Sequence, residues 1–388
     1  MPIVPRPFVL RIPRKLVYSA ILVTTVLVGL EVRQRSVESR KWGRRNARPY
    51  SLCLETAQGR RYDPFQRGTL TLSVAPYLVY ANKAGQRTRF MNVNAQGFRG
   101  RDWTLEKPEG ALRVVLLGGS TAFGFGATDD DAVHTAVLER LLRAAPQLAG
   151  RTVEVWNAGV VGYDSTQEMI LLSTRVLDYR PDVVVLFDAY NDFNYSGVYR
   201  PGAREIVQPR FFELDQRVAD GSRPWLVLMR CSAFYRRIEE IVREYKERHG
   251  GGIPYRTFYD NVKVASVQYR RNLERMTRLA KASGVAIVLA PQPEIFHRRG
   301  EIPAPEQELR ETFTEWGYAD YARSQYPLYV AAAEEVARRE SVPFVDTSAA
   351  FDAVPDHVFT DGAHLTDRGN ELVARCLLPT LVDLLARP

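Results

Sequence analysis

From residue 112 onward, the chain alternates between short apolar runs and longer segments in which apolar residues recur at helical spacing. The apolar runs predict buried parallel strands, because few polar side chains interrupt them. These runs are LRVVLLG (112–118), TVEVWNAG (152–159), PDVVVLFDAYND (181–192), GVAIVLAPQ (284–292) and VPFVDTS (342–348). Strands that alternate with helices favour a parallel sheet with helices on both faces. In such a sheet, ligands bind beyond the carboxyl ends of the strands.

The helical spacing is clearest in DDDAVHTAVLERLLRAA (129–145) and in STQEMILLSTRVLDY (165–179). Aspartates at the start of the first segment favour a helix N-terminus, because a cap and the helix dipole both prefer acidic side chains there. Residues 193–260 do not fit the alternation. We interpret them as an insertion beside the site, with a helix near 224–248.

The segment before the alternating region has a different pattern. Residues 1–15 form a basic tail, and LVYSAILVTTVLVGL (16–30) contains fifteen residues without a charge. A membrane-spanning helix needs about 20 apolar residues, and no small-residue cleavage site follows this run. We therefore predict an uncleaved transmembrane anchor helix at 16–32, with the rest of the protein outside the cytoplasm. Residues 33–110 are expected to form an extension with short strands, packed on a catalytic domain at 111–388.

Charge changes this picture only near the N-terminus. The chain of 388 residues carries a formal net charge of +8, and many arginines and lysines flank the apolar run at 16–30. Such a distribution favours an anionic membrane surface. No zinc-finger spacing or aromatic RNA-binding signature indicates a nucleic-acid partner. The three cysteines, Cys53, Cys231 and Cys376, form no CxxC pair, so they predict neither a metal site nor a redox motif.

The first apolar run leads into GGSTAFGFG, which places Ser120 directly after a predicted strand. A serine nucleophile needs a histidine base, an acid that orients the histidine, and donors for the developing oxyanion. Of the five histidines, His364 lies in FTDGAHLTDRGN, with Asp361 three residues before it. At that spacing the carboxylate can reach one ring nitrogen while the other nitrogen faces outward.

Other histidines have similar neighbours, so this pair is not decisive by itself. His134 follows Asp131 at the same spacing, but both lie in a predicted helix, so we interpret them as a helix-surface histidine and a cap. His297, with Glu294 three residues before it, follows a predicted strand and is an alternative base. The two remaining histidines have no acid at that spacing: His249 and His357.

The α/β-hydrolase fold is another known setting for such a serine. Gly118 and Ser120 fit its G-x-S-x-G motif, but Ala122 replaces the last glycine. In that fold, several strands precede the nucleophile, and the acid and the histidine lie well apart. Here the serine follows the first strand of the alternating region, and Asp361 and His364 lie three residues apart near the C-terminus. The order of the motifs therefore counts against this fold.

The order of the motifs instead resembles that of the SGNH (GDSL-type) hydrolase family, over about residues 113–385. The resemblance implies a flavodoxin-like three-layer α/β/α fold with a mainly parallel sheet. It implies no metal and no organic cofactor. By this resemblance, Ser120 in GGST is the nucleophile, and Asp361 with His364 matches the D-x-x-H block.

The resemblance also implies an oxyanion hole with three donors. These would be the Ser120 N–H, a backbone N–H in NAGVVGYDS (157–165), and the side-chain amide of Asn191 in AYND. Gly162 is the first candidate for the second donor, and Gly159 is the alternative.

Two positions depart from the family pattern. Gly119 stands where many members carry aspartate, at a position that varies in the family. Ala189 replaces the glycine of the G-x-N-D block, and alanine adopts a positive φ less readily than glycine. If this loop requires a positive φ, we expect Asn191 to be misplaced and the activity to be low.

These features predict a membrane-anchored serine esterase that hydrolyses an O-acyl ester through an acyl-enzyme on Ser120. The resemblance and the basic N-terminus favour O-acetyl groups on a cell-envelope polysaccharide, or lipid esters at the membrane, as substrates. The same triad could instead pass its acyl group to a sugar hydroxyl, as an O-acyltransferase. A non-catalytic, membrane-tethered carbohydrate-binding protein is a third alternative, favoured only by Ala189.

Overall fold

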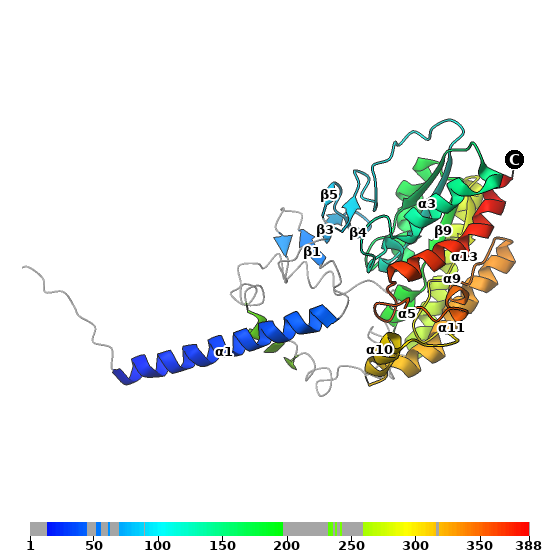
Figure 1. Cartoon of the computed structure of the whole chain (residues 1–388). Coiled ribbons are helices and arrows are strands. Elements are labelled where there is room, and N and C mark those ends of the chain that lie inside the picture. The colour runs from blue at the N-terminus through cyan, green and yellow to red at the C-terminus, as the bar shows by residue number, and fades with distance from the viewer. Residues whose placement is uncertain are drawn as a thin grey trace, which may run out of the picture. The chain divides into compact units, whose positions relative to one another are not determined.

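The computed structural model of the chain describes residues 14–44, 52–55, 61–62, 70–88, 90–196, 232–235, 237–238, 241–242, 259–315 and 318–387. The chain divides into two compact units (Figure 1). The first comprises residues 1–47 and 222–250, and the second comprises residues 48–221 and 251–388. Most of the insertion predicted at 193–260, including most of its helix, lies outside the described residues.

In the first unit, one long helix, α1 (Arg14–Arg44), contains the apolar run. The carboxylate of its Glu31 accepts hydrogen bonds from the Ser232 hydroxyl at 2.8 Å and from the N–H groups of Ala233 and Phe234 at 3.0 Å. Burial alone would raise the pKa of Glu31, but these hydrogen bonds lower it to about 2. The apolar run therefore ends at an ionised carboxylate that is bound within its own unit.

Among the described residues, no helix has an apolar stretch long enough to cross a membrane. The transmembrane anchor predicted at 16–32 is therefore not supported. A helix rises about 1.5 Å per residue, so a run of about fifteen residues covers only about 22 Å of a hydrocarbon core about 30 Å thick. Glu31, Arg33 and Arg35 follow closely, and charged groups in that core are costly.

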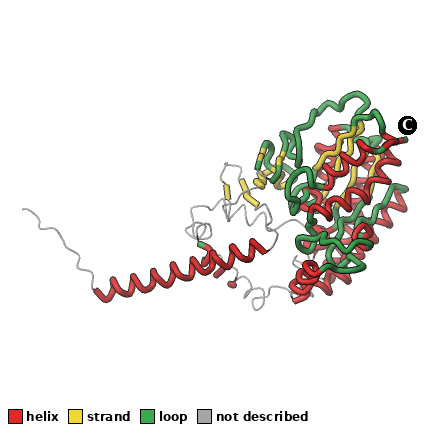
Figure 2. Tube along the Cα trace, in the orientation of Figure 1, coloured by secondary structure: helices red, strands yellow, loops and turns green. Residues whose placement is uncertain are grey.

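The second unit is built on a parallel four-stranded sheet with the strand order β10-β9-β7-β8. Its strands are β7 (Leu112–Gly118), β8 (Val153–Asn157), β9 (Val183–Phe187) and β10 (Ala286–Leu289). Every residue of β7, β8 and β9 is buried, so both faces of the sheet are covered. The strands lie among the helices of this unit (Figure 2). The α/β fold with a parallel sheet, predicted from the apolar runs, is confirmed.

The fifth apolar run, 342–348, forms only a single parallel bridge, between Phe344 and Leu289. The Leu289 N–H donates to the Pro343 carbonyl, and the Val345 N–H donates to the Leu289 carbonyl, each at 3.0 Å. Pro343 has no N–H of its own, which limits further pairing on that side. The predicted strand is thus reduced to one residue at the sheet edge.

Two pairs of long helices lie against this sheet (Figure 1). In one pair α3 (His134–Ala144) packs on α13 (Asp367–Ala386), and in the other α9 (Tyr259–Ala282) packs on α11 (Tyr318–Glu340). The shorter helices are α2 (Ser120–Phe123), α4 (Ser165–Leu171), α5 (Tyr190–Ser196), α10 (Ala304–Glu315) and α12 (Ala349–Asp352). Helices α4 and α5 both contact α9, so the loops that follow β8 and β9 meet on the α9 side of the sheet.

The helix predicted at 129–145 begins only at His134, and its N-cap is Val133 rather than an aspartate. The interpretation of His134 as a helix-surface histidine is wrong, because its side chain is fully buried. His134 Nδ1 lies 2.8 Å from Asn370 Oδ1. Burial lowers the pKa of His134 to about 4, so the ring is neutral at neutral pH and has a structural role between α3 and α13.

The helix predicted at 165–179 is interrupted. Its first turn is capped by Asp164, whose carboxylate accepts from the N–H groups of Thr166 and Gln167 at 3.0 and 3.2 Å. Regular α-helical geometry ends with α4. A π-helical turn (Leu172–Val176) and a 3₁₀ turn (Leu177–Tyr179) complete the segment, and a further 3₁₀ turn lies at Pro146–Leu148.

The short strands expected in 33–110 are present. One sheet has the order β2-β1-β3-β4, with β1 (Leu52–Glu55), β2 (Arg61–Tyr62), β3 (Leu70–Ala75) and β4 (Val79–Asn82). A hairpin of β5 (Gln86–Arg87) and β6 (Asn92–Val93) follows. Beyond it, Arg99 forms antiparallel bridges with Val93 and with Asn157, the last residue of β8. This segment is therefore continuous with the edge of the main sheet.

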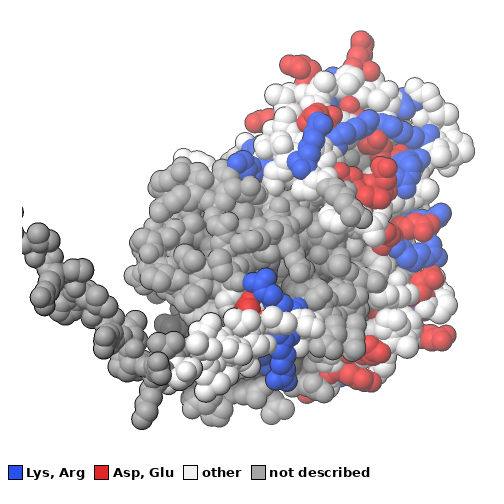
Figure 3. All heavy atoms as spheres, turned by 60° about the vertical axis from the view of Figure 1, so that its left-hand side comes forward, with Lys and Arg blue, Asp and Glu red and all other residues white. Residues whose placement is uncertain are grey.

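Charged side chains are mixed in sign on the surface. On the face drawn in Figure 3, acidic and basic side chains of the described residues lie interspersed. Some form ion pairs, such as Arg368 with Asp356 at 2.9 Å and with Glu371 at 2.8 Å.

Candidate active site

Ser120 is the first residue of α2, just beyond the carboxyl end of β7. The turn between them depends on glycine, because a Cβ on Gly118 would lie 2.1 Å from the Phe187 carbonyl oxygen. The Ser120 N–H lies in the first helical turn, where no carbonyl of the same helix can accept it. Ser120 therefore presents a hydroxyl and a backbone N–H at the sheet edge where α/β proteins bind ligands.

The Ser120 hydroxyl contacts a histidine that is itself bound to an acid. Ser120 Oγ lies 2.7 Å from His364 Nε2. His364 Nδ1 lies 2.9 and 2.8 Å from the two carboxylate oxygens of Asp361. Asp361 Oδ1 also accepts from the N–H groups of Ala363 and His364, at 3.1 and 3.0 Å. The fixed carboxylate favours a proton on Nδ1, which leaves Nε2 to accept the serine proton.

The turn that carries His364 is held directly against the nucleophile helix. Thr121 Oγ1 donates to the Ala363 carbonyl at 3.2 Å. The ring of Phe125 packs on the imidazole, with 5.0 Å between the ring centroids. These contacts join two segments that are 244 positions apart in the chain, so the serine and the histidine meet through packing and not through local sequence.

Asn191 lies in the first turn of α5, after β9. Its Nδ2 donates to the Tyr163 carbonyl at 2.6 Å. A Cβ on Gly119 would lie 2.3 Å from the same Nδ2, so the amide packs against the peptide that precedes Ser120. The glycine at position 119 thus leaves the space that this amide occupies. An amide nitrogen carries two hydrogens, so a second donor is present beside Ser120.

The loop after β8 contains the two candidate backbone donors. The Gly159 N–H donates to Asn157 Oδ1 at 3.0 Å, and a Cβ on Gly159 would lie 2.2 Å from the Phe123 nitrogen. Gly159 therefore packs the loop against α2, and its N–H is engaged locally. Gly162 has a φ of 83°, which glycine adopts without strain. Gly162 lies three residues further along the same loop and stays the first candidate donor.

The model of the GDSL-like lipase/acylhydrolase family matches residues 116–372, which is more than half of the chain. The chain belongs to this family. The protein is an SGNH-type serine hydrolase that acts on ester bonds, and the membership predicted from its motifs is confirmed.

Several solved structures are similar to this acylhydrolase at low identity. An acetylxylan esterase from Geobacillus stearothermophilus has 17% identity and a TM-score of 0.40, over 70% of this chain and 95% of that one. TesA has 15% identity and a TM-score of 0.41, over 70% and 99%. A lipase/acylhydrolase from Enterococcus faecalis has 17% identity and a TM-score of 0.40, over 70% and 96%. No curated protein matches the chain.

In this acylhydrolase, Ala189 adopts a φ of 86°, so the loop does require the positive φ for which the family uses glycine. The expected displacement of Asn191 is nevertheless not observed, because its amide still reaches the Tyr163 carbonyl. A left-handed alanine costs about 1–2 kcal/mol in backbone strain. The Ala189 methyl group is fully buried, and a buried methyl contributes about 0.8 kcal/mol, which offsets part of this strain.

We expect Ala189→Gly to change little. Relief of about 1–2 kcal/mol of strain is offset by the lost methyl burial and by about 0.5–1 kcal/mol of extra chain entropy in glycine. Because Asn191 is already in position, kcat should stay within about twofold of wild type, and urea unfolding should show a nearly unchanged midpoint. A tenfold rise in kcat would instead show that alanine displaces Asn191 in the working enzyme.

The alternative pair, Glu294 and His297, has a structural arrangement. Glu294 Oε2 accepts from the N–H groups of Phe296 and His297, at 2.8 and 3.1 Å. Glu294 Oε1 accepts from the Tyr318 hydroxyl at 3.2 Å. The carboxyl group therefore holds its own turn together instead of orienting the imidazole. The histidine in contact with the serine is His364.

Complete burial raises the pKa of Glu294 from 4.5 to about 8. Since the folded pKa exceeds the unfolded one, the stabilisation by the bound proton is complete below pH 4.5 and is lost as the pH rises towards 8. The shift corresponds to at most about 5 kcal/mol.

Glu294→Gln cannot ionise and keeps an acceptor for the turn. Its free energy of urea unfolding should therefore fall less than that of wild type between about pH 5 and pH 8. Equal decreases in the two proteins would contradict a neutral Glu294.

Four buried acids adjoin the loops of Gly162 and Asn191, and the sequence analysis assigned none of them a role: Asp164, Glu168, Asp188 and Asp192. Asp192 ties the two loops together, because its carboxylate accepts from the Ser165 hydroxyl at 2.6 Å and from the Ser165 N–H at 2.9 Å. Burial and the neighbouring carboxyl groups raise the pKa of Glu168 and of Asp192 well above the usual range. A sequence signal exists for Asp188 and Asp192, which closely follow the apolar residues of β9. In the described part of the chain, no group of acids, histidines and cysteines is arranged to hold a metal ion.

Proposed function

We propose that this acylhydrolase is a serine esterase in which Ser120 is the nucleophile, His364 is the general base and Asp361 orients the base. The observation that carries the proposal is the continuous contact from Ser120 Oγ to His364 Nε2, at 2.7 Å, and from His364 Nδ1 to Asp361, at 2.8 Å. A flavodoxin-like three-layer arrangement is part of the same proposal, and the burial of both faces of the parallel sheet supports it.

In the first half-reaction, Ser120 Oγ attacks the ester carbonyl carbon while His364 Nε2 takes the hydroxyl proton. The carbonyl oxygen becomes an oxyanion, which the N–H groups of Ser120 and Gly162 and the Nδ2 of Asn191 stabilise. As the tetrahedral intermediate collapses, the bond to the alcohol breaks and His364 gives its proton to the leaving oxygen. In the second half-reaction, His364 activates water, which releases the acid and restores the Ser120 hydroxyl.

The proposed substrate is an O-acyl ester on a sugar, with O-acetyl groups of a cell-envelope polysaccharide as the first choice and lipid esters as the second. Membership of the acylhydrolase family supports an ester as the substrate, but it does not indicate which alcohol the ester contains. Analysis of products with and without an added glycan acceptor distinguishes hydrolysis from acyl transfer. Carbohydrate binding without catalysis is less favoured, because binding alone needs no contact between Ser120 and His364. A location outside the cytoplasm stays a prediction.

A fluorophosphonate probe tests the proposal on the full chain without knowledge of the substrate. The probe phosphonylates only an activated serine, so mass spectrometry should locate the label on Ser120. His364→Ala should prevent labelling, because the hydroxyl loses its base. No label on a folded wild-type protein, or a label on a different serine, would refute the assignment.

A further inference from the structure

The segment 70–103, here called the N-terminal brace, precedes the residues that match the family model. It nevertheless packs against both loops that carry the proposed site. Its strands β3 and β4 and the hairpin β5–β6 lead to Arg99, whose backbone pairs with the end of β8. Two of its side chains, Tyr80 and Arg99, are almost completely buried, with exposed fractions of 1% and 3%.

Tyr80 holds the loop around Gly162 from both sides. The Tyr80 hydroxyl donates to the Val161 carbonyl at 3.0 Å, and the Tyr163 hydroxyl donates back to the Tyr80 carbonyl. The two tyrosine rings pack edge to face, with 5.4 Å between their centroids. Both chain neighbours of Gly162 are therefore bound to one residue of the brace. The Tyr163 carbonyl in turn accepts from Asn191, so the same contact reaches a second proposed oxyanion donor.

Asn82 and Leu78 extend this attachment along the loop. Asn82 Nδ2 donates to the Gly159 carbonyl at 3.0 Å, and Gln167 Nε2 donates to the Leu78 carbonyl at 2.9 Å. The brace thus binds the start of the loop at Gly159 and the two chain neighbours of Gly162. It also binds Gln167 in α4, the helix that follows the loop. A loop that is held at several points loses little further freedom when the transition state forms.

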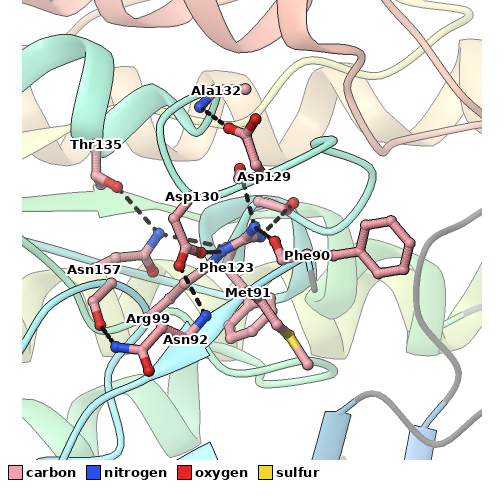
Figure 4. A network of polar contacts seen from close by, with 12 residues as sticks. Phe90, Met91, Asn92, Arg99, Phe123, Asp129, Asp130, Ala132, Thr135 and Asn157 are labelled. Carbon is pink, nitrogen blue, oxygen red and sulfur yellow. Dashed lines mark hydrogen bonds and ion pairs between the residues drawn. The ribbon is translucent and has the colours of Figure 1, made fainter. Parts of the chain in front are cut away.

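Arg99 holds the other half of the site (Figure 4). Its guanidinium lies 5.1 Å from the centroid of the Phe123 ring, and Nη1 donates to the carbonyls of Phe123 and Gly124, at 3.1 and 2.8 Å. These carbonyls end α2, the short helix that begins with Ser120. A cation at a helix C-terminus is favourable, because the unpaired carbonyls there carry partial negative charge.

The remaining contacts fix the guanidinium itself. Arg99 Nε pairs with Asp130 Oδ1 at 2.8 Å, and Nη2 donates to the carbonyls of Phe90 and Asp129, each at 3.2 Å. Asp130 Oδ2 also accepts from the Asn92 N–H at 2.8 Å, as Figure 4 shows. The carboxylate of Asp130 thus compensates the charge of Arg99. The planar guanidinium links the brace to the carbonyls of Gly124 and Asp129, in the turn that follows α2.

We propose that the N-terminal brace is part of the catalytic apparatus, with Tyr80 positioning the Gly162 N–H and Arg99 positioning Ser120 at the start of α2. This inference rests on the proposed esterase mechanism. An oxyanion donor must lie within a few tenths of an ångström of its ideal place, and a displacement of about 1 Å costs roughly 100-fold in rate. Removing one hydroxyl of the brace should produce part of that loss.

The test compares Tyr80→Phe and Arg99→Lys with wild type, in the full chain, on a chromogenic acetyl ester. The first variant keeps the ring packing but loses the bond to Val161. The second keeps the charge, but one ammonium cannot reproduce the fork that spans two carbonyls. Each should lower kcat by roughly tenfold while KM stays within about twofold, because the affected donors act mainly on the transition state. Values of kcat are normalised to Ser120 titrated with fluorophosphonate, so that a loss of folded protein does not contribute.

Tyr321→Phe is the matched control. Its hydroxyl also donates to a backbone carbonyl at 3.0 Å, that of Phe193, and its side chain is equally buried, with 1% exposed. That carbonyl belongs to helix α5, and the N–H of the same residue donates to the Ala189 carbonyl at 3.0 Å, so a backbone hydrogen bond holds Phe193 without Tyr321. Tyr321→Phe should therefore keep both kcat and KM within about twofold of wild type.

The outcomes separate this inference from the function on which it rests. If wild type is titrated at Ser120 but both brace variants keep the wild-type kcat, the brace has no positioning role. An equal loss in Tyr321→Phe would likewise overturn the inference, since any lost buried hydroxyl would then suffice. If wild type is not titrated at Ser120, the proposed function fails and the inference fails with it.

Discussion

Replacing Ser120 with alanine is expected to lower kcat for ester hydrolysis by about 10⁴- to 10⁶-fold, with the protein still folded. Alanine removes the atom that forms the acyl-enzyme, and only the oxyanion donors and substrate binding are left to accelerate attack by water. The Ser120 hydroxyl is at the surface of a rigid turn, and its one described hydrogen bond goes to His364. Thermal unfolding should therefore be close to that of wild type.

His364→Ala should show a loss of the same order, and the double variant should be hardly worse than either single one. The two side chains act as one unit, so their effects are not additive. His297→Ala is the matched control, because His297 is the other histidine with an acid three residues before it. It should keep nearly full activity. Loss of activity in His297→Ala with retention in His364→Ala would exchange the two assignments.

Asn191→Ala is expected to lower kcat by about 10²- to 10³-fold with little change in KM. The amide lies against the peptide before Ser120, where the oxyanion would form, so it contributes mainly when charge develops on that oxygen. The measurement is steady-state kinetics on a chromogenic acetyl ester, together with thermal unfolding to establish that the fold is kept.

Asn191→Asp separates the donor from the shape of the side chain. Aspartate has the same size, but it replaces two N–H donors with an acceptor that repels an oxyanion. Its kcat should fall at least as far as that of the alanine variant. Wild-type turnover in Asn191→Ala, or in Asn191→Asp, would remove this residue from the oxyanion hole.

Local sequence patterns determined the elements of the second unit. The runs at 112–118 and 181–192 predict strands because a sheet covered on both faces needs continuous apolar side chains. The short motifs GGST, AYND and D-x-x-H also indicated the family, since each lies within a few residues of a strand end or a turn. A one-residue bridge at 342–348 and a late start of α3 at His134 are the main differences. They arise where a proline or a long-range contact overrides the local pattern.

The apolar run at 16–30 shows the limit of composition as a guide. Its fifteen uncharged residues resemble the core of an anchor. In the described structure, α1 continues past the run, and the carboxylate of the next residue, Glu31, is bound to Ser232 about two hundred positions later in the chain. No property of the run itself reveals that contact.

Only the tertiary structure decided which of the candidate residues meet. The sequence offered His364 as the base with His297 as the alternative, and Gly162 as the first candidate donor with Gly159 as the second. The packing of the 359–365 turn on α2 brings His364 Nε2 within 2.7 Å of Ser120 Oγ, and the Gly159 N–H is bound to Asn157 Oδ1. Tyr80 and Arg99 belong to no motif, because their partners lie in loops brought to them by strand order. Periodicity encodes burial and local geometry, whereas contacts across 244 positions depend on the complete folded sheet.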